Sequence, residues 1–135
     1  MNYFLLKTEP STYSFSDLQR EKTTVWSGVA NAAALIHIRS MQKGDMAMIY
    51  HTGTERACIG TAQITSNAYP DPEESNEKLV VVDLRAKKPL NRPVTLDEIK
   101  SDKVFATWDL LRISWLSVVP THEKLWHRIL ELSDK

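Results

Sequence analysis

The sequence has little of the material from which disulfide, metal or phosphate-loop sites are built. Cys58 is the only cysteine, so no internal disulfide can form, and this fits a reducing compartment. The histidines are scattered, and neither a Cys-x-x-Cys nor a His-Glu-x-x-His motif occurs, so we expect no metal site. The chain has only 4 glycines, placed far apart, which excludes a glycine-rich phosphate loop. We therefore expect no cofactor.

Long apolar runs are also absent. No stretch approaches the ~20 apolar residues that a membrane-spanning helix needs. The first residues, MNYFLL, lack the basic and apolar regions of a secretory signal peptide. The sequence thus predicts a protein without membrane contact that is cytoplasmic, or nuclear in a eukaryote.

Charge of either sign is not in excess, because 17 Lys and Arg residues balance 17 Asp and Glu residues. A neutral domain binds bulk DNA or RNA poorly, since phosphate neutralisation supplies most non-specific affinity. Any nucleic-acid partner would need a pocket. Basic residues are in local excess in one part of the chain. Such an excess is typical of a solvated strand end, but it could instead form a track that binds the phosphate backbone of a nucleic acid. The candidates for such a track are Arg39, Lys43, Arg85, Lys87, Lys88 and Arg92.

Hydrophobic periodicity predicts short elements in mixed order. Strands are expected at Tyr3–Lys7, Met46–Thr52, Cys58–Thr65, Lys78–Ala86 and Trp115–Pro120. Helices are expected after Ser14, over Asn31–Met41, after Thr95 and after Thr121, and each of these Ser and Thr residues would cap its helix. No regular βαβ alternation is present, which argues against a doubly wound sheet. The pattern favours one α+β domain over residues 1–135, with a small barrel-like sheet and helices at its ends.

The segment Trp26–Asn31, WSGVAN, joins an extended stretch to a helix and is the most informative part of the chain. A tryptophan for stacking, free backbone at Gly28 and an asparagine amide could form one wall for a flat ligand such as a nucleobase. Trp115 also flanks a loop–strand junction and is a second candidate platform. We expect Trp108 and Trp126 to pack in the core.

Two other functions remain open from the residues. Glu9 follows the first strand and His51 ends another, so they could form an acid–base pair in an enzyme that acts on a nucleotide-like substrate. Alternatively, Glu9 pairs with Lys7 or caps a turn, and His51 only bonds to the backbone. Cys58 is expected to be a buried, unreactive thiol. The third possibility is a protein–protein module that uses Trp115 and the closing helix.

Several segments, in their order and spacing, resemble the EVE domain family of the PUA-like superfamily. They are YFLLKTEPSTYSFSDL, W-SGVAN, RSMQKGDMAMIYHT, IGTAQIT with AYPDP, VVVDLRAKKPLNRPVTLDEIK, LLRISWLSVVP and LWHRIL, and they cover about Asn2 to Leu132. The resemblance implies a PUA-like pseudo-barrel of five or six mixed strands with short flanking helices. It also implies a non-catalytic aromatic pocket that holds a modified nucleobase of DNA or RNA, flipped out or single-stranded, or a free modified nucleoside.

The resemblance assigns the pocket to four motifs. The residues are Lys7, Glu9, Trp26, Gly28, Val29, Asn31, Tyr50, His51, Thr52, Leu116, Ser117 and Val118. The chain departs from the family pattern at Ala30, Ala32 and Ala33, where the family has arginine, tyrosine and glutamine, and at Trp115, where arginine is frequent. Loss of the arginine removes a potential phosphate or base contact and enlarges the site, so the ligand could differ from the family's usual one.

Overall fold

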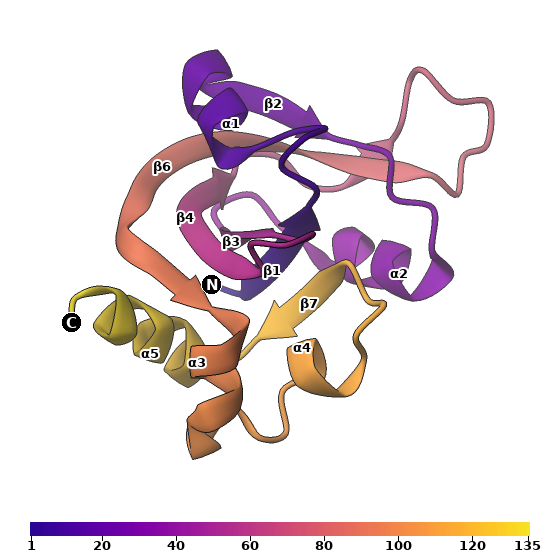
Figure 1. Cartoon of the computed structure of the whole chain (residues 1–135). Coiled ribbons are helices and arrows are strands. Elements are labelled where there is room, and N and C mark those ends of the chain that lie inside the picture. Colours follow the sequence, from indigo (N-terminus) through magenta and orange to yellow (C-terminus); the bar gives the residue numbers. More distant parts are fainter.

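The fold is built on one mixed sheet that curls around the core and stays open (Figure 1). It was obtained as a computed structural model, which describes all 135 residues. The strands are β1 (Tyr3–Thr8), β2 (Thr23–Trp26), β3 (Met46–His51), β4 (Ala57–Ile64), β5 (Tyr69–Pro70), β6 (Val80–Thr95) and β7 (Val118–Thr121). Their order is β2-β6-β4-β3-β1-β7, with β5 beside β6. Only the β1–β3 pair is parallel.

Short helices surround the sheet, as expected for an α+β pseudo-barrel. They are α1 (Phe15–Glu21), α2 (Ala32–Ser40), α3 (Leu96–Ser101), α4 (Asp109–Arg112) and α5 (Glu123–Ser133), with a 3-10 turn at Lys103–Phe105. The predicted fold class is confirmed. The sheet has seven strands instead of five or six, because β2 and the two-residue β5 add to the five strands predicted by range. None of the helices reaches the length and apolarity that crossing a bilayer requires.

Local capping rules account for the helix starts well. Ser14 and Asp17 form a reciprocal capping box at α1, and Thr95 and Glu98 form one at α3. In each box a side chain accepts a hydrogen bond from a backbone N–H that the helix itself cannot satisfy. Both predicted caps are therefore confirmed.

The predicted cap of the closing helix was wrong. Thr121 is the last residue of β7, where it is buried opposite Tyr3, and its hydroxyl donates to the Val119 carbonyl oxygen. His122 caps α5 instead, with its Nδ1 accepting from the Lys124 N–H at 3.1 Å. Strand pairing with β1 keeps Thr121 in the sheet, so the helix begins one residue later than its sequence pattern indicates.

The strand predicted over Lys78–Ala86 continues well beyond its expected end. β6 continues from Val80 to Thr95 through Pro89 and Pro93, residues that interrupt most central strands. β2 pairs with β6 only as far as Arg85. Beyond that point one edge of β6 has no partner strand, so a missing proline N–H breaks no ladder on that side. The strand predicted from Trp115, in contrast, starts only at Val118, where its pairing with β1 begins.

A single cluster of 31 buried apolar residues forms the core. It includes Trp108, whose indole N–H donates to the Pro120 carbonyl oxygen at 3.0 Å, and Trp126, whose ring lies 4.9 Å from that of Tyr3. Both tryptophans thus pack as predicted. Cys58 is completely buried, and burial raises the pKa of its thiol, so the thiol stays protonated.

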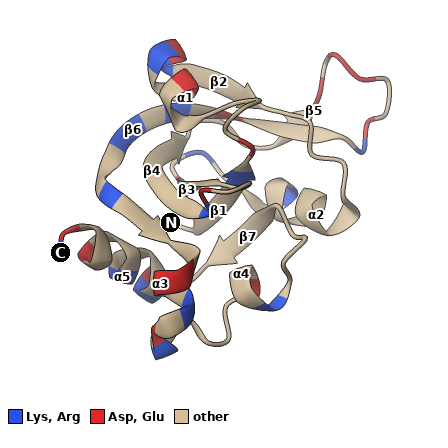
Figure 2. Ribbon diagram, viewed as in Figure 1, with Lys and Arg blue, Asp and Glu red and all other residues tan.

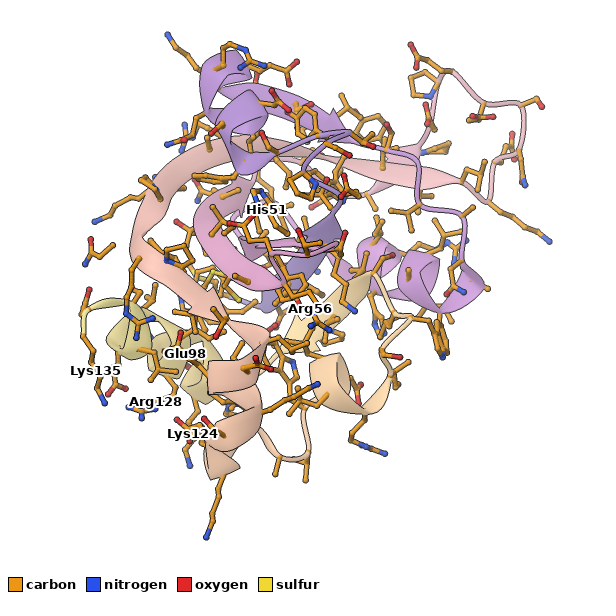
Figure 3. All side chains as sticks on the ribbon, in the orientation of Figure 1. His51, Arg56, Glu98, Lys124, Arg128 and Lys135 are labelled. Atoms are coloured by element: carbon orange, nitrogen blue, oxygen red, sulfur yellow. The ribbon has the colours of Figure 1, made fainter.

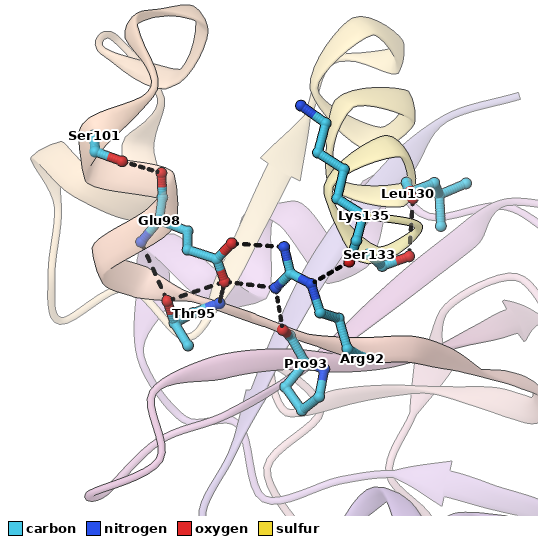
Figure 4. A network of polar contacts seen from close by, with 8 residues as sticks. All are labelled: Arg92, Pro93, Thr95, Glu98, Ser101, Leu130, Ser133 and Lys135. Atoms are coloured by element: carbon cyan, nitrogen blue, oxygen red, sulfur yellow. Dashed lines mark hydrogen bonds and ion pairs between the residues drawn. The ribbon is translucent and has the colours of Figure 1, made fainter.

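Arg92 ties β6 to α3 and to the C-terminus (Figure 4). Its guanidinium forms two hydrogen bonds of 2.8 Å with the Glu98 carboxylate, and its Nε donates to the main-chain oxygen of Lys135 at 3.1 Å. The Arg92 guanidinium, helped by the Thr95 N–H, lowers the pKa of Glu98 to about 2. This carboxylate therefore stays charged in the folded protein far below the pH at which it would protonate in an unfolded chain.

We expect Glu98→Gln to lower the free energy of unfolding by about 1 kcal/mol at pH 7, a value reduced because the pair is a third exposed. A depressed pKa stabilises the fold above the ordinary value of about 4.5, and this contribution is lost as the pH falls toward about 2. The difference between the variant and the wild type should shrink over that range in urea titrations. A difference that stays constant over that range would contradict the prediction.

Candidate functional site

The WSGVAN segment forms one wall of an open cavity of about 650 Å³, here called the first cavity. β2 ends at Trp26, and Gly28, with a φ of +82°, turns the chain toward the start of α2. The opposite wall comes from the end of β1, the loop that follows it, and Ser117. The lining residues are Lys7, Thr8, Glu9, Thr12, Tyr13, Thr24, Val25, Trp26, Ser27, Gly28, Val29, Ala30, Asn31 and Ser117.

Trp26 forms part of this wall from the edge of the core. It pairs with Val82 on β6 and is only 8% exposed. Tyr13 lies edge-on to it, with ring centroids 6.1 Å apart and planes inclined by 76°. A flat ligand would therefore meet a recessed aromatic corner made by two rings, and not the open face of a free tryptophan.

Asn31 has two roles at the cavity because it is also the N-cap of α2. Its Oδ1 accepts hydrogen bonds from the Ala33 N–H at 2.9 Å and the Ala34 N–H at 3.2 Å. The helix thus uses the amide oxygen, and the Nδ2 group has no protein partner. From the sequence we expected the Asn31 amide both to donate and to accept hydrogen bonds with a ligand. Because the helix cap uses its oxygen, chiefly the Nδ2 donor remains for a ligand.

Two charged groups of opposite sign flank the cavity. Lys7 is half-buried and its Nζ donates to the Ser114 carbonyl oxygen at 2.9 Å; burial lowers the pKa of this amine. The Glu9 carboxylate accepts from the Ser11 N–H and hydroxyl, which lowers the pKa of Glu9 and keeps it ionised. The cavity therefore carries almost no net charge, in agreement with the whole chain.

Seven of the twelve predicted pocket residues lie around the first cavity. They are Lys7, Glu9, Trp26, Gly28, Val29, Asn31 and Ser117. Tyr50 and Thr52 instead line a second cavity, of about 300 Å³, which shares Lys7 with the first. His51, Leu116 and Val118 are buried and line neither.

Strand alternation explains this separation. Successive side chains in extended chain point to opposite faces, so Ser117 reaches the cavity while its neighbours Leu116 and Val118 enter the core, where they are 2% and 0% exposed. The motif LSVV gave the right segment but could not tell which of its residues face a ligand. The expectation that Leu116 and Val118 line the pocket was wrong.

Sequence reasoning missed the segment between β1 and α1 as part of this wall. Thr12 and Tyr13 line the first cavity, as does Thr24 of β2. For Thr12 and Tyr13, the only available signal was their position inside the KTEPSTYS stretch. The Tyr13 hydroxyl hydrogen-bonds to Glu21, and burial together with this bond raises the pKa of Tyr13.

The six basic residues considered as a phosphate track do not line the first cavity. Arg85, Lys87, Lys88 and Arg92 are spaced along β6, where Figure 2 shows separate bands of basic residues. Arg92 is already bound to Glu98. Arg39 of α2 donates to the Lys78 carbonyl oxygen, and Lys43 lies in the turn before β3.

The structure also gives His51 and Glu9 separate partners. The His51 Nε2 accepts from the Phe15 N–H at 3.0 Å, and its Nδ1 lies 2.7 Å from a Glu55 carboxylate oxygen. This arrangement defines a neutral ring with its proton on Nδ1, buried in the middle of the fold (Figure 3). Both ring nitrogens are occupied, so His51 anchors the start of α1 and offers no free base to a substrate. No three His, Cys, Asp or Glu side chains gather in a way that could hold a metal ion.

The alanines that depart from the family pattern lie at the start of α2. Ala30 and Ala32 are exposed and Ala33 is half-buried, and only Ala30 lines the first cavity. The cavity mouth is therefore bordered by a methyl group at the position where the family pattern has arginine. Trp115, the other departure, is 64% exposed in the turn before β7.

An open, PUA-like α+β pseudo-barrel with a cavity between the ends of β1 and β2 defines the class of this protein. Within that class, the chain belongs to the EVE domain family, whose model matches residues 2–132. The resemblance inferred from the motifs is thus confirmed.

Relatives and solved structures agree with this assignment. Rat thymocyte nuclear protein 1 is 31% identical over 126 residues, which cover 74% of this chain and 56% of that protein. The chain thus spans about half the length of the curated relatives it matches. A protein of Rhodopseudomonas palustris solved by NMR has a TM-score of 0.94 at 35% identity, covering 99% of this chain and 94% of its own. Human THYN1, solved in complex with DNA containing 5-methylcytosine, has a TM-score of 0.91 at 25% identity, with coverages of 100% and 99%.

Proposed function

We propose that this protein is a non-catalytic reader that holds one modified nucleobase, from DNA or RNA, in the first cavity. The carrying observation is the cavity itself, a volume of about 650 Å³ lined by the aromatic corner of Trp26 and Tyr13 and by the Asn31 donor. The complex of human THYN1 with DNA containing 5-methylcytosine supports this choice of ligand class. An extruded base or a free modified nucleoside could enter from the open side.

The chemistry of the wall suits a base that carries an added apolar group. Such sites are mostly apolar with a few placed polar groups, and their volumes are typically about 300–1,000 Å³. Val25, Trp26 and Val29 supply apolar surface. The Asn31 amide N–H and the Ser117 hydroxyl supply polar contacts to a base edge. Stacking against an aromatic ring contributes roughly 1–3 kcal/mol per base.

The neutral charge of the chain favours an already unpaired base. Extruding a base from a duplex costs a few kcal/mol, and a protein with equal numbers of acidic and basic residues gains little from phosphate contacts to offset that cost. We therefore infer a preference for single-stranded or frayed substrate.

The direct test is a titration of modified and plain nucleosides and single-stranded oligonucleotides, followed by tryptophan fluorescence. We expect saturable quenching that is stronger for a modified base. Ala30→Trp should weaken binding about tenfold or more, because a bulky ring at the mouth of the cavity excludes the ligand. Ala32→Trp, an exposed alanine two residues further along, is the matched control and should bind as the wild type does. Equal binding by both variants, or no saturation with any ligand, would refute the proposal.

Asn31 permits a second test that separates helix capping from recognition. Asn31→Asp keeps an N-cap acceptor, so the free energy of unfolding should stay within about 0.5 kcal/mol of the wild type. The same change replaces the amide donor by a carboxylate, and we expect the affinity for a modified base to fall about tenfold. Asn31→Ala should lose stability by about 1 kcal/mol as well. Unchanged affinity in the aspartate variant would show that Asn31 acts only as a cap.

A further inference from the structure

The second cavity lies on the other side of Lys7 from the first. It is enclosed by the end of β3, the loop that leads to β4, α3 and the segment before β7. Its lining residues are Lys7, Tyr50, Thr52, Gly53, Arg56, Leu96, Lys100, Leu110 and Ser114. Arg56 and Lys100 are neither among the pocket residues that the EVE resemblance assigns nor among the residues of the predicted phosphate track.

Three cations converge here without a carboxylate among the lining residues. The ion pairs of the chain involve other basic groups, so Arg56 and Lys100 have no acidic partner. Glu55, next to Arg56 in the sequence, is bound to His51 instead. The Glu9 carboxylate reaches Gly53 at the edge of this cavity, where an added Cβ would lie 2.8 Å from its Oε1. Lys7 is thus offset by Glu9, whereas Arg56 and Lys100 leave positive charge unneutralised around a small concave volume.

Tyr50 provides an independent sign of a ligand. Its side chain is 3% exposed, and its hydroxyl forms no hydrogen bond with the protein. Every completely buried side-chain nitrogen or oxygen in the chain has a partner, so this hydroxyl reaches the cavity surface. Burial raises the pKa of Tyr50 to about 12, which keeps the phenol protonated as a donor. A buried donor without a protein acceptor is available to an anion.

The backbone at Arg56 is also unusual. Its φ is +43°, a left-handed conformation that costs a non-glycine residue roughly 1 kcal/mol. The Leu96 N–H holds it there by donating to the Arg56 carbonyl oxygen at 2.8 Å. In Figure 3, Arg56 lies in the middle of the fold, well away from Lys124 and Arg128 of α5.

We propose that the second cavity binds a phosphate group of the nucleic-acid strand whose modified base occupies the first cavity. Lys7, Arg56, Lys100 and the Tyr50 hydroxyl donate to the phosphate oxygens. Lys7 lines both cavities, so it links the base to its phosphate. The identity of the phosphate as part of a nucleotide rests on the proposed function, whereas oxyanion binding by the second cavity does not.

The second cavity also explains how a protein without net charge could bind a nucleic-acid strand. Its positive charge would act at one phosphate next to the bound base and not along the whole backbone. Ser114 lines the second cavity and Ser117 lines the first, so a short segment before β7 contributes to both.

The first experiment uses inorganic phosphate alone and measures NMR shifts of the ¹⁵N-labelled protein at constant ionic strength. We expect saturable shifts at the Gly53, Arg56 and Lys100 amides. The double variant Arg56→Gln/Lys100→Gln should bind at least tenfold more weakly, since hydrogen bonds to charged groups are lost. The control, Lys103→Gln/Lys124→Gln, removes two exposed cations elsewhere and should match the wild type. Absence of saturation, or equal binding by both double variants, would overturn the proposal.

The second experiment compares a modified nucleoside with its 5′- and 3′-monophosphates and with a dinucleotide whose linkage is charged or an uncharged methylphosphonate. We expect a phosphate in one of the two positions to increase affinity about tenfold, and the Arg56/Lys100 variant to lose this increase. If the nucleoside binds and no phosphate adds affinity, the second cavity does not bind a phosphate of the nucleic-acid strand. If phosphate binds but no nucleoside does, the proposed function fails while the anion site remains.

Discussion

Gly60→Ala is expected to lower the free energy of unfolding by about 3 kcal/mol, and to be among the most damaging small substitutions in the chain. The distal end of the Phe15 ring lies against this glycine on β4, and an added Cβ would come within 2.3 Å of its Cζ atom. Phe15 is 2% exposed and begins α1. The ring cannot withdraw without moving the helix, so the methyl group forces either the strand or α1 out of place. Urea unfolding at neutral pH measures the loss.

A double-mutant cycle identifies the contact as the cause. Phe15→Leu removes the ring edge that meets the new methyl group, so Gly60→Ala should cost much less in that background than in the wild type. Gly44→Ala is a useful comparison, because nothing lies within 4 Å of its added Cβ and only its φ of +100° opposes the change. Additive losses at Phe15 and Gly60 would show that backbone conformation, and not the ring, sets the cost.

His51→Ala is the second large effect that we expect, at about 3 kcal/mol of lost stability. The substitution leaves the Phe15 N–H without its acceptor inside the protein and opens a void next to α1. A buried unsatisfied donor costs roughly 1–3 kcal/mol, and the void adds to this cost. Thermal or urea unfolding gives the value directly.

His51→Gln serves as the partial rescue, since its amide oxygen can accept from the Phe15 N–H. It should recover about half of the loss. The affinity of the folded His51→Gln protein for a modified nucleoside shows whether His51 anchors α1 or acts on the ligand. If it only anchors the helix, the affinity should stay close to that of the wild type. If it contacts the ligand, the affinity should fall.

Much of the local structure could be predicted because it depends on residues close together in the sequence. Ser14 and Asp17 form their capping box within one turn of helix, and Thr95 and Glu98 do the same. The alternating and continuous apolar stretches of β1, β3 and β4 were found for a similar reason. The family motifs then placed these elements in a known order.

The errors occur where a distant partner decides the outcome. Thr121 has the chemistry of a cap, but β1 holds it in the sheet. Pro89 and Pro93 mark strand ends in isolation, but β6 continues past them because its outer edge has no partner there. Tyr50 was assigned to the base pocket through its motif, whereas the parallel pairing of β3 with β1 turns it toward the second cavity.

The family, the fold class, most element positions and the Trp26–Asn31 cavity wall could all be predicted from the chain alone. These follow from local capping, periodicity and motif spacing. Three other features are visible only in the folded protein: Tyr13 packs against Trp26, the Asn31 amide oxygen caps the helix, and Lys7, Arg56 and Lys100 surround one small cavity. Those relations join residues up to 93 positions apart, from Lys7 to Lys100. Strand pairing and side-chain packing bring such residues together, and neither can be recognised from the residues of one short segment.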